Sequence, residues 1–285
     1  MNLFAGELKG AETNSGFSSR GFTLIELIVV MVVLSILAVI GTGFVVKTTD
    51  AYQRTQTRAL LVNTARQALE RMTRQLRVAL PYSVRIINDG QCIEFMPIVA
   101  GGNYIDGNTT TTFADPVPDV ANGASPSSQF SVAPFTAVNT FGTPQHVTIG
   151  ALGSAEIYTS PYVSRANYSP TSTNILIRLA TTKRWQRNSI NKRFYLLADP
   201  QAFCLVGSEL HFYSGIPITA ASVTTGAGAS IIARNVAAAN PSSPIPFSLE
   251  MGTENRNTRI NIALRFSSGG ESIDFTQGVL IRNVP

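Results

Sequence analysis

Charged side chains and the residues that most often carry out chemistry are scarce in this sequence. Only 14% of its 285 residues are charged, and it contains two histidines, two cysteines and one tryptophan. His146 and His211 belong to no H-E-x-x-H or Cys/His ligand pattern, and no G-x-S-x-G or Walker-type loop occurs. The sequence therefore predicts no enzyme, no metal site and no cofactor. We interpret His211 as a strand residue that faces solvent.

The low charge also bears on partners. In a typical domain about a quarter of the residues are charged. Here Ser, Thr, Asn and Gly take the place of charged residues, as in β-rich extracellular proteins. The net charge of +5 suits a protein beside an anionic membrane or cell surface. It is too diffuse to indicate a nucleic-acid partner.

The two cysteines, Cys92 and Cys204, each lie in an apolar, strand-like run. An even count permits one disulfide in an oxidising compartment, and two buried, unpaired thiols are the alternative. If the head lies outside the cytoplasm, we expect the disulfide.

The N-terminal region predicts a membrane span. Residues 1–19 contain no apolar run, whereas residues 22–46 form one that is long enough to cross a bilayer as a helix. A secretory signal peptide has its small-residue cleavage site after a shorter apolar core. Here the cleavage signal, Arg20-Gly21, precedes the apolar run, which argues against an ordinary signal peptide.

Glu26 is out of place within this apolar run, because an unpaired charge in a membrane helix is costly. It could extend to the lipid headgroups. Cleavage between Gly21 and Phe22 offers a second solution, because the new α-amino group would lie one helical turn from Glu26. That ion pair could form within one chain or between neighbouring chains.

The run Arg20–Glu26 (RGFTLIE), followed by an apolar helix, resembles the cleavage and methylation motif of type IV pilins and type II secretion pseudopilins. The resemblance implies that a prepilin peptidase removes a leader, residues 1–21, and N-methylates Phe22. It also implies that Glu26 meets the N-terminus of an adjacent subunit. The expected partners are other pilins, an inner-membrane assembly platform and membrane lipid. The chain would span the inner membrane once with its head in the periplasm, and later reach the pilus and cell surface.

Residues 47–80 contain no proline and predict an amphipathic stem helix. Apolar residues recur at steps of three and four and form one stripe: Leu61, Ala65, Leu69, Met72, Leu76 and Ala79. Arg54 and Arg58 occupy the same face nearer the membrane, so only the lower half of the stem is expected to pack on the head. Gly41 and Gly43 lie above the stem, and we hypothesise that the helix loosens there inside a filament.

Residues 81–285 predict a β-rich head, and the whole chain an α+β, pilin-like fold with the helix on an antiparallel sheet. Strand-like segments alternate in polarity or are rich in apolar residues: 84–87, 92–99, 156–159, 174–179, 194–197, 203–206, 209–213, 259–266 and 272–282. Asn88-Asp89-Gly90 predicts a hairpin turn. Residues 100–144 and 219–246 are expected to be long loops, with a possible strand at 230–236.

Three roles remain open at this point. The segments Gln67–Arg77 and Cys92–Phe95 resemble minor pilins of the mannose-sensitive haemagglutinin pilus, its O component in particular, which indicates a minor pilin that helps to start a pilus. The second is a J-type pseudopilin of type II secretion. The third is a pilus-borne adhesin, supported by the segment 101–143 and by Trp185, which we interpret as an exposed aromatic on a hairpin.

Overall fold

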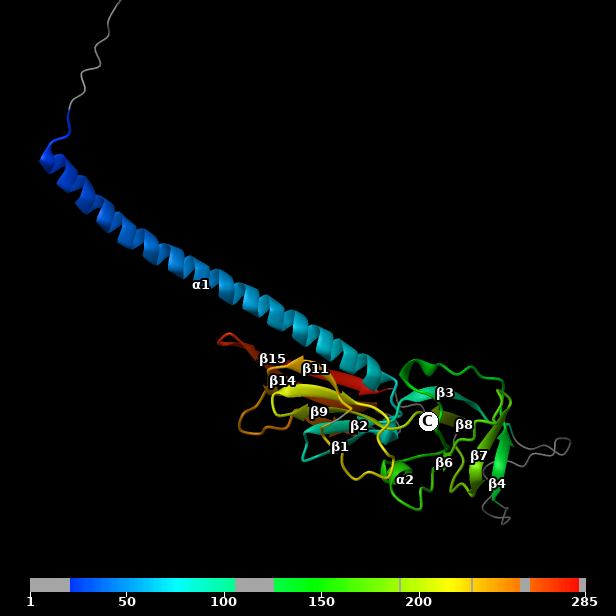
Figure 1. Ribbon diagram of the computed structural model, residues 1–285. Coiled ribbons are helices and arrows are strands. Elements are labelled where there is room, and N and C mark those ends of the chain that lie inside the picture. The colour runs from blue at the N-terminus through cyan, green and yellow to red at the C-terminus, as the bar shows by residue number, and fades with distance from the viewer. Residues whose placement is uncertain (1–20, 106–125, 190, 227, 252–256, 282–285) are drawn as a thin grey trace, which may run out of the picture. The chain divides into compact units, whose positions relative to one another are not determined.

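The computed structural model describes residues 21–105, 126–189, 191–226, 228–251 and 257–281 (Figure 1). A single long helix is followed by antiparallel sheets, which confirms the predicted α+β, pilin-like architecture. The chain forms two compact units, residues 1–53 and residues 54–285.

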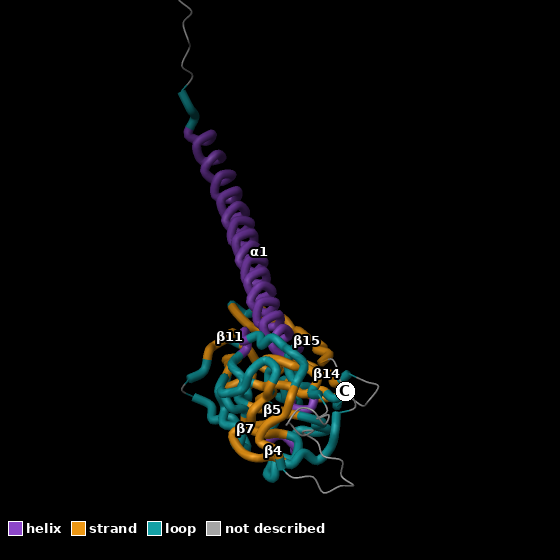
Figure 2. Tube along the Cα trace, turned by 90° about the vertical axis from the view of Figure 1, so that its right-hand side faces the viewer, coloured by secondary structure: helices purple, strands orange, loops and turns teal. Residues whose placement is uncertain are grey.

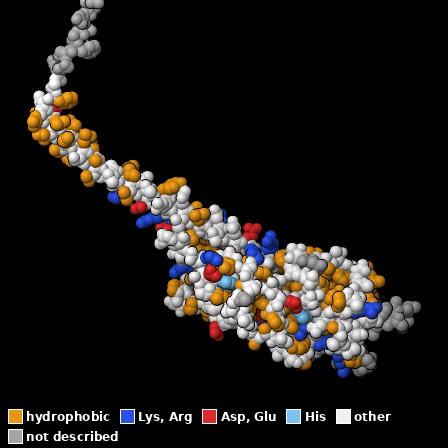
Figure 3. All heavy atoms as spheres, in the orientation of Figure 1, with side chains coloured by type: hydrophobic (Ala, Val, Ile, Leu, Met, Phe, Trp, Pro, Cys, Tyr) orange, Lys and Arg blue, Asp and Glu red, His pale blue; other side chains and the backbone are white. Residues whose placement is uncertain are grey.

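Helix α1 (Leu24–Arg77) begins at a polar cap and supplies all the described regular structure of the first unit. The Thr23 hydroxyl accepts a hydrogen bond from the backbone N–H of Glu26 at 3.3 Å, so it pairs one of the N–H groups that a helix start leaves free. Every residue from 24 to 53 is exposed. Figure 3 shows hydrophobic side chains along this part of α1 on the face in view, as expected for a helix that meets lipid or other helices.

The stem part of α1 packs on the head of the second unit through the predicted apolar stripe. Its buried residues are Leu61, Ala65, Ala68, Leu69, Met72 and Leu76. Met72 and Leu76 are completely buried. The first buried residue of the helix is Leu61, which is also the first residue of the predicted stripe. The periodicity therefore identified the face that meets the head, and missed only Ala68.

The helix ends at Arg77, three residues before the predicted end at Leu80. Leu80 precedes Pro81, and a residue before proline is disfavoured in the α conformation. The three residues after the helix instead pair with the head: the Val78 carbonyl accepts from Ile98 at 2.8 Å, and the Leu80 N–H donates to Met96 at 3.0 Å. Tertiary hydrogen bonds thus replace the last helical turn.

Two antiparallel sheets and the stem enclose the main core. The first has the order β1 (Arg85–Ile87), β2 (Cys92–Phe95), β9 (Gln201–Val206), β10 (Glu209–Tyr213) and β11 (Ser230–Arg234). In the second, β14 (Thr258–Ser268) pairs on one edge with β12 (Val236–Ala238) and β13 (Phe247–Glu250), and on the other with β15 (Glu271–Ile281). Side chains from both sheets and from α1 form one hydrophobic cluster.

A separate lobe is inserted between β2 and β9, which are neighbours in the first sheet. Its strands are β3 (Ile98–Asn103), β4 (Ser127–Ser131), β5 (His146–Thr148), β6 (Arg165–Asn167), β7 (Leu176–Lys183) and β8 (Arg193–Leu197). They form a sheet of order β3-β8-β5-β6 and a β4–β7 pair around their own hydrophobic core. Figures 1 and 2 both show β4 and β7 at the end of this unit that is far from β11 and β15.

Short helices connect these strands: η1 (Pro81–Ser83), η3 (Asn139–Phe141) and α2 (Ala155–Tyr158). The predicted strand at 156–159 is wrong, because residues 156–158 lie in α2 and Thr159 follows its end. The predicted strand at 174–179 is shifted, since β7 runs from Leu176 to Lys183. Alternation along so short a segment does not distinguish a turn of helix from a strand.

The two predicted loops contain regular structure. Residues 100–144 include the end of β3, all of β4 and η3, although 106–125 lie outside the described residues. The possible strand at 230–236 is two strands, β11 and β12, in different sheets. The break between them falls at Asn235, whose φ of 56° is one that few residues other than Gly, Asn and Asp adopt readily. The predicted hairpin turn at Asn88-Asp89-Gly90 is confirmed, since it joins β1 to β2.

Candidate processing and assembly site

Gly21 and Phe22 lie before α1 in a segment without regular structure. Phe22 is 78% exposed, and a Cβ added at Gly21 would meet no atom within 4 Å. The fold therefore does not require a glycine here. An exposed peptide bond beside a residue with no side chain is instead what a protease can accommodate.

Glu26 lies in the first turn of α1, where the partial positive charge of a helix N-terminus favours a carboxylate. Its side chain is exposed. By length and composition, α1 can cross a membrane. The apolar stretch of α1 that is long enough to do so contains no buried residue. The site thus consists of an exposed peptide bond, a nearby acid and a helix suited to lipid.

The stem is tied to the head by one contact that the sequence pattern did not predict. The Arg58 Nε donates to Glu271 Oε2 at 2.7 Å, although Arg58 remains 65% exposed. One residue earlier, the Thr57 Cγ2 lies 3.5 Å from the position that a Cβ on Gly269 would occupy. The β14–β15 turn therefore rests on the stem beyond the end of the apolar stripe.

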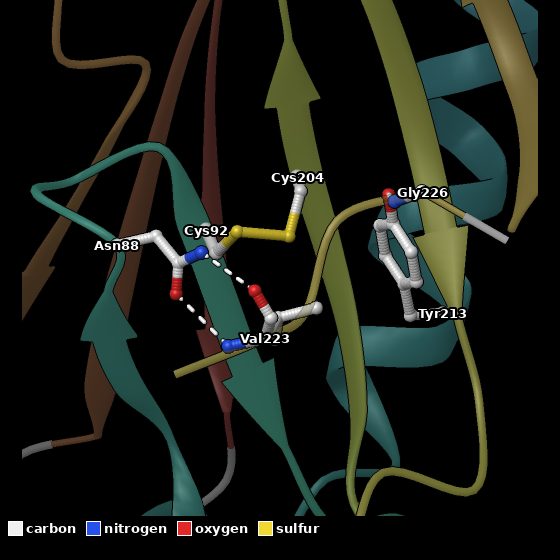
Figure 4. Close-up of a disulfide and its surroundings, with 6 residues drawn as sticks. All are labelled: Asn88, Cys92, Cys204, Tyr213, Val223 and Gly226. Carbon is white, nitrogen blue, oxygen red and sulfur yellow. Dashed lines mark hydrogen bonds between the residues drawn. A yellow bond between two sulfur atoms is a disulfide. The ribbon is translucent and has the colours of Figure 1, made fainter. Parts of the chain in front are cut away.

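Cys92 and Cys204 form a disulfide in the structure (Figure 4). They are directly opposite each other on β2 and β9, with their Cα atoms 4.1 Å apart, and both are buried. Their sequence separation of 112 residues contains the entire lobe. The bond thus closes the base of the insertion.

A connecting segment covers this disulfide on the side away from the stem. The Asn88 amide donates to the Val223 carbonyl at 2.8 Å and accepts from the Val223 N–H at 3.0 Å. The Tyr213 hydroxyl accepts from the N–H of Gly226 at 3.3 Å. Figure 4 shows these contacts on either side of the sulfur atoms. Residues of the expected loop 219–246 therefore shield the disulfide from solvent.

A buried ion pair lies where the lobe meets the first sheet. Arg85 on β1 pairs with Glu94 on β2, and Glu94 is completely buried. The guanidinium also donates to the Ala220 carbonyl at 2.7 Å and lies 3.8 Å from the centre of the Tyr158 ring. Burial raises the pKa of Glu94, and Arg85 acts in the opposite direction. Arg85 thus joins the first sheet, α2 and the segment over the disulfide.

His146 is held neutral inside the lobe. Arg165, also buried, can only donate hydrogen bonds, so His146 Nδ1 accepts from it at 3.0 Å. The proton must then reside on Nε2, which donates to Asp199 Oδ1 at 3.1 Å. Burial and the Arg165 charge lower the pKa of His146, with Asp199 acting in the opposite direction. His146 is therefore a structural bridge.

Two sequence-based interpretations of the head are wrong. Trp185 is only 3% exposed and lies in the lobe core, so it is not an exposed aromatic. His211 does not simply face solvent: its side chain is 14% exposed and its Nε2 lies 3.0 Å from Glu209 Oε2. Among the described residues, no group of three or more His, Cys, Asp or Glu side chains could hold a metal ion.

Comparison with known proteins gives one match. Residues 16–42 match the family described as the prokaryotic N-terminal methylation motif, and this segment contains Gly21, Phe22 and Glu26. The chain thus carries a type IV prepilin-like motif, which implies processing by prepilin peptidase, membrane anchoring and assembly with other pilins. No curated protein and no solved structure matches the chain.

One of the two ion pairs Arg85–Glu94 and Arg58–Glu271 could in part have been found from sequence. Once the hairpin turn is placed with Ile87 opposite Cys92, the register puts Arg85 opposite Glu94. By contrast, Arg58 and Glu271 are separated by 213 residues, and no local pattern links them.

Proposed function

We propose that this chain is a minor pilin that takes part in the initiation and assembly of a type IV pilus of the mannose-sensitive haemagglutinin type. In this proposal, prepilin peptidase cleaves after Gly21 and N-methylates Phe22. Glu26 then pairs with the N-terminus of an adjacent subunit. The chain spans the inner membrane once with its head in the periplasm, and later becomes part of the pilus at the cell surface.

The observation that carries the proposal is the combination of this N-terminal motif with a lobe inserted into the head. The motif on an exposed apolar helix supports membership of a filament. The lobe supports low copy number, because it enlarges the head at the end that is far from β11 and β15 (Figures 1 and 2). We infer that this added bulk suits a place at the end of a filament better than a position that repeats along it.

The burial of Trp185 removes one of the two supports of an adhesin role. The resemblance of Gln67–Arg77 and Cys92–Phe95 to minor pilins supports the proposal over a secretion pseudopilin. Both alternatives remain outcomes of the experiment below.

The test is to count surface filaments on cells that lack this gene, complemented with the native chain or with Glu26→Val. We expect few or no filaments without the gene, rescue by the native chain and no rescue by the variant. A Glu70→Val variant, with the same change on an exposed stem position, should rescue. Normal filaments in the deletion strain would contradict the proposal. Exoprotein release and surface attachment, measured next, would then distinguish a secretion pseudopilin from an adhesin.

A further inference from the structure

Strand β15 forms an edge of the second sheet. All eleven of its residues, from Glu271 to Ile281, are in register with β14, and no other described strand pairs with it. Within the part of the chain that the structure describes, one side of its backbone is therefore free.

The turn defines which backbone groups are free. Gly269 and Gly270 have φ values of 55° and 79°, as a two-residue type I′ turn requires, so Ser268 and Glu271 form the closing hydrogen-bonded pair. Hydrogen-bonded and non-bonded pairs then alternate along the ladder. The residues in non-bonded pairs direct their N–H and C=O groups away from β14: Ser272, Asp274, Thr276, Gly278 and Leu280. All five are exposed.

This edge strand lacks the features that normally prevent an edge strand from pairing with a strand of another chain. Native edges are protected by proline, by lysine, by bulges or by unpaired charges. β15 contains no proline, lysine or arginine and no irregularity in its register. Its acidic outer residue, Asp274, is paired by Arg265 through two hydrogen bonds of 2.6 and 2.8 Å. A long, regular and nearly neutral edge is thus exposed.

Gly278 gives this edge a specific chemistry. Its φ is not positive, so the backbone itself does not demand glycine. A Cβ there would lie 3.3 Å from Arg259 Nε, because the Arg259 side chain extends across β15 at this point. Arg259 is exposed and forms no ion pair within the described chain. Beside it, Leu280 is 56% exposed. A cation and an apolar side chain therefore border the free backbone groups.

We propose that the free edge of β15 binds an extended strand of a different, neighbouring pilin-type subunit. That strand carries an acidic residue opposite Gly278, where it meets Arg259, and an apolar residue opposite Leu280. The proposal rests on the proposed function. Main-chain hydrogen bonds supply affinity in such strand addition, and alternate side chains supply specificity. A second copy of β15 is a poorer partner, because its two acidic residues, Glu271 and Asp274, are already paired with Arg58 and Arg265 and offer no free acid to Arg259.

The test compares two lysine substitutions on the same face of the sheet. Thr276→Lys places a charge on the free edge, whereas Ala263→Lys places it on the cross-strand neighbour, one strand inward. Each full-length variant is expressed in the deletion strain, and its incorporation into purified filaments is measured. We expect loss of incorporation for Thr276→Lys and native incorporation for Ala263→Lys, with both chains cleaved and present in the membrane.

Hydrogen exchange provides a second readout that does not depend on a variant. Amides of Ser272, Asp274, Thr276 and Gly278 should exchange rapidly in the detergent-solubilised chain and become protected in filaments. Alternate amides, such as that of Phe275, should be protected in both, because they bond to β14. A photo-crosslinker at position 276 should form an adduct with an edge strand of another methylated pilin subunit.

The outcomes separate this inference from the proposed function. A chain that enters filaments with equally fast exchange at these four amides would overturn the inference alone. Native incorporation of Thr276→Lys, or adducts formed only with a second copy, would also overturn it. A native chain that never enters filaments would instead overturn the proposed function.

Discussion

Removal of the Cys92–Cys204 disulfide should reveal whether the lobe folds independently of the main sheets. If the lobe unfolds together with the β2–β9 pair, the bond closes a loop of about 112 residues. Its loss, in a Cys92→Ser/Cys204→Ser variant, would then lower the free energy of unfolding by about 5 kcal/mol in the chain-entropy treatment. If the lobe stays folded, the Ile98–Leu197 pair of β3 and β8 already closes most of that loop.

In the second case only the segments 92–98 and 197–204 remain to be closed. They are equivalent to a loop of about 15 residues, for which the same treatment gives about 3 kcal/mol. The lobe has its own core, with Phe130, Phe194 and Ile177 almost fully buried. We therefore predict the smaller loss of about 3 kcal/mol.

The sequence supplies a probe for each part. Trp185 is the only tryptophan and lies in the lobe core, so its fluorescence reports on the lobe alone. Far-ultraviolet circular dichroism reports on all strands. Residues 54–285, one compact unit, would be unfolded in guanidinium chloride with both probes. We expect the variant to shift the dichroism transition to lower denaturant and to leave the Trp185 transition unchanged.

Native protein in reductant is the matched control, because it breaks the same bond without any change of sequence. A common shift of both probes, corresponding to about 5 kcal/mol, would refute the argument that the lobe is independent. No shift in either probe would mean that the bond does not constrain the unfolded chain.

Three further predictions concern packing, pH and charge. Met72→Ala should lower the free energy of unfolding by about 2–5 kcal/mol, because Met72 is completely buried between the stem and the sheets. Stability should fall as pH decreases below about 6.5, the ordinary pKa of an unfolded histidine, because the lowered pKa of His146 opposes protonation beside Arg165. Glu271→Gln should cost less than about 1 kcal/mol, and salt should diminish the effect, since its partner Arg58 is largely exposed. Denaturant unfolding of residues 54–285 measures all three.

Each of these predictions has its own control. Glu70→Ala, on the exposed side of the stem, should change stability by no more than about 0.5 kcal/mol. His146→Asn keeps an acceptor toward Arg165 without a titrating ring, and should flatten the pH dependence between pH 5 and 7, on the scale where histidine titrates. A native chain with equal stability at both ends of that range would contradict the His146 argument. A large, salt-independent loss in Glu271→Gln would contradict the assignment of a weak surface pair.

The N-terminal features could be predicted because their physical causes are local. The apolar run of residues 22–46, the position of Glu26 four residues after Phe22 and the signal before it all lie within a few helical turns. The stripe from Leu61 to Leu76 could likewise be predicted, since a helix repeats every 3.6 residues whatever it packs against. The turn at Asn88-Asp89-Gly90 was equally accessible, because the required φ values are a property of those residues.

The head's organisation depended on contacts that the sequence does not encode locally. Short apolar segments such as residues 156–159 suit either a turn of helix or a strand. In the structure Tyr158 lies in a helical turn and its ring packs against Arg85. Trp185 has polar and charged neighbours in sequence, yet the lobe core encloses it. The burial of a large side chain depends on elements that arrive from elsewhere in the chain.

The sequence by itself determined the class of N-terminus, the helical stem with its packing face, and the presence of many short strands. Only the tertiary structure decided that β2 pairs with β9 across the inserted lobe, that Arg58 meets Glu271, and that β15 keeps one free edge. Helical periods and turns arise from the backbone conformation of neighbouring residues. The partner of a strand is selected among many competing strands by the burial of the whole head, so its identity appears only when the chain has folded.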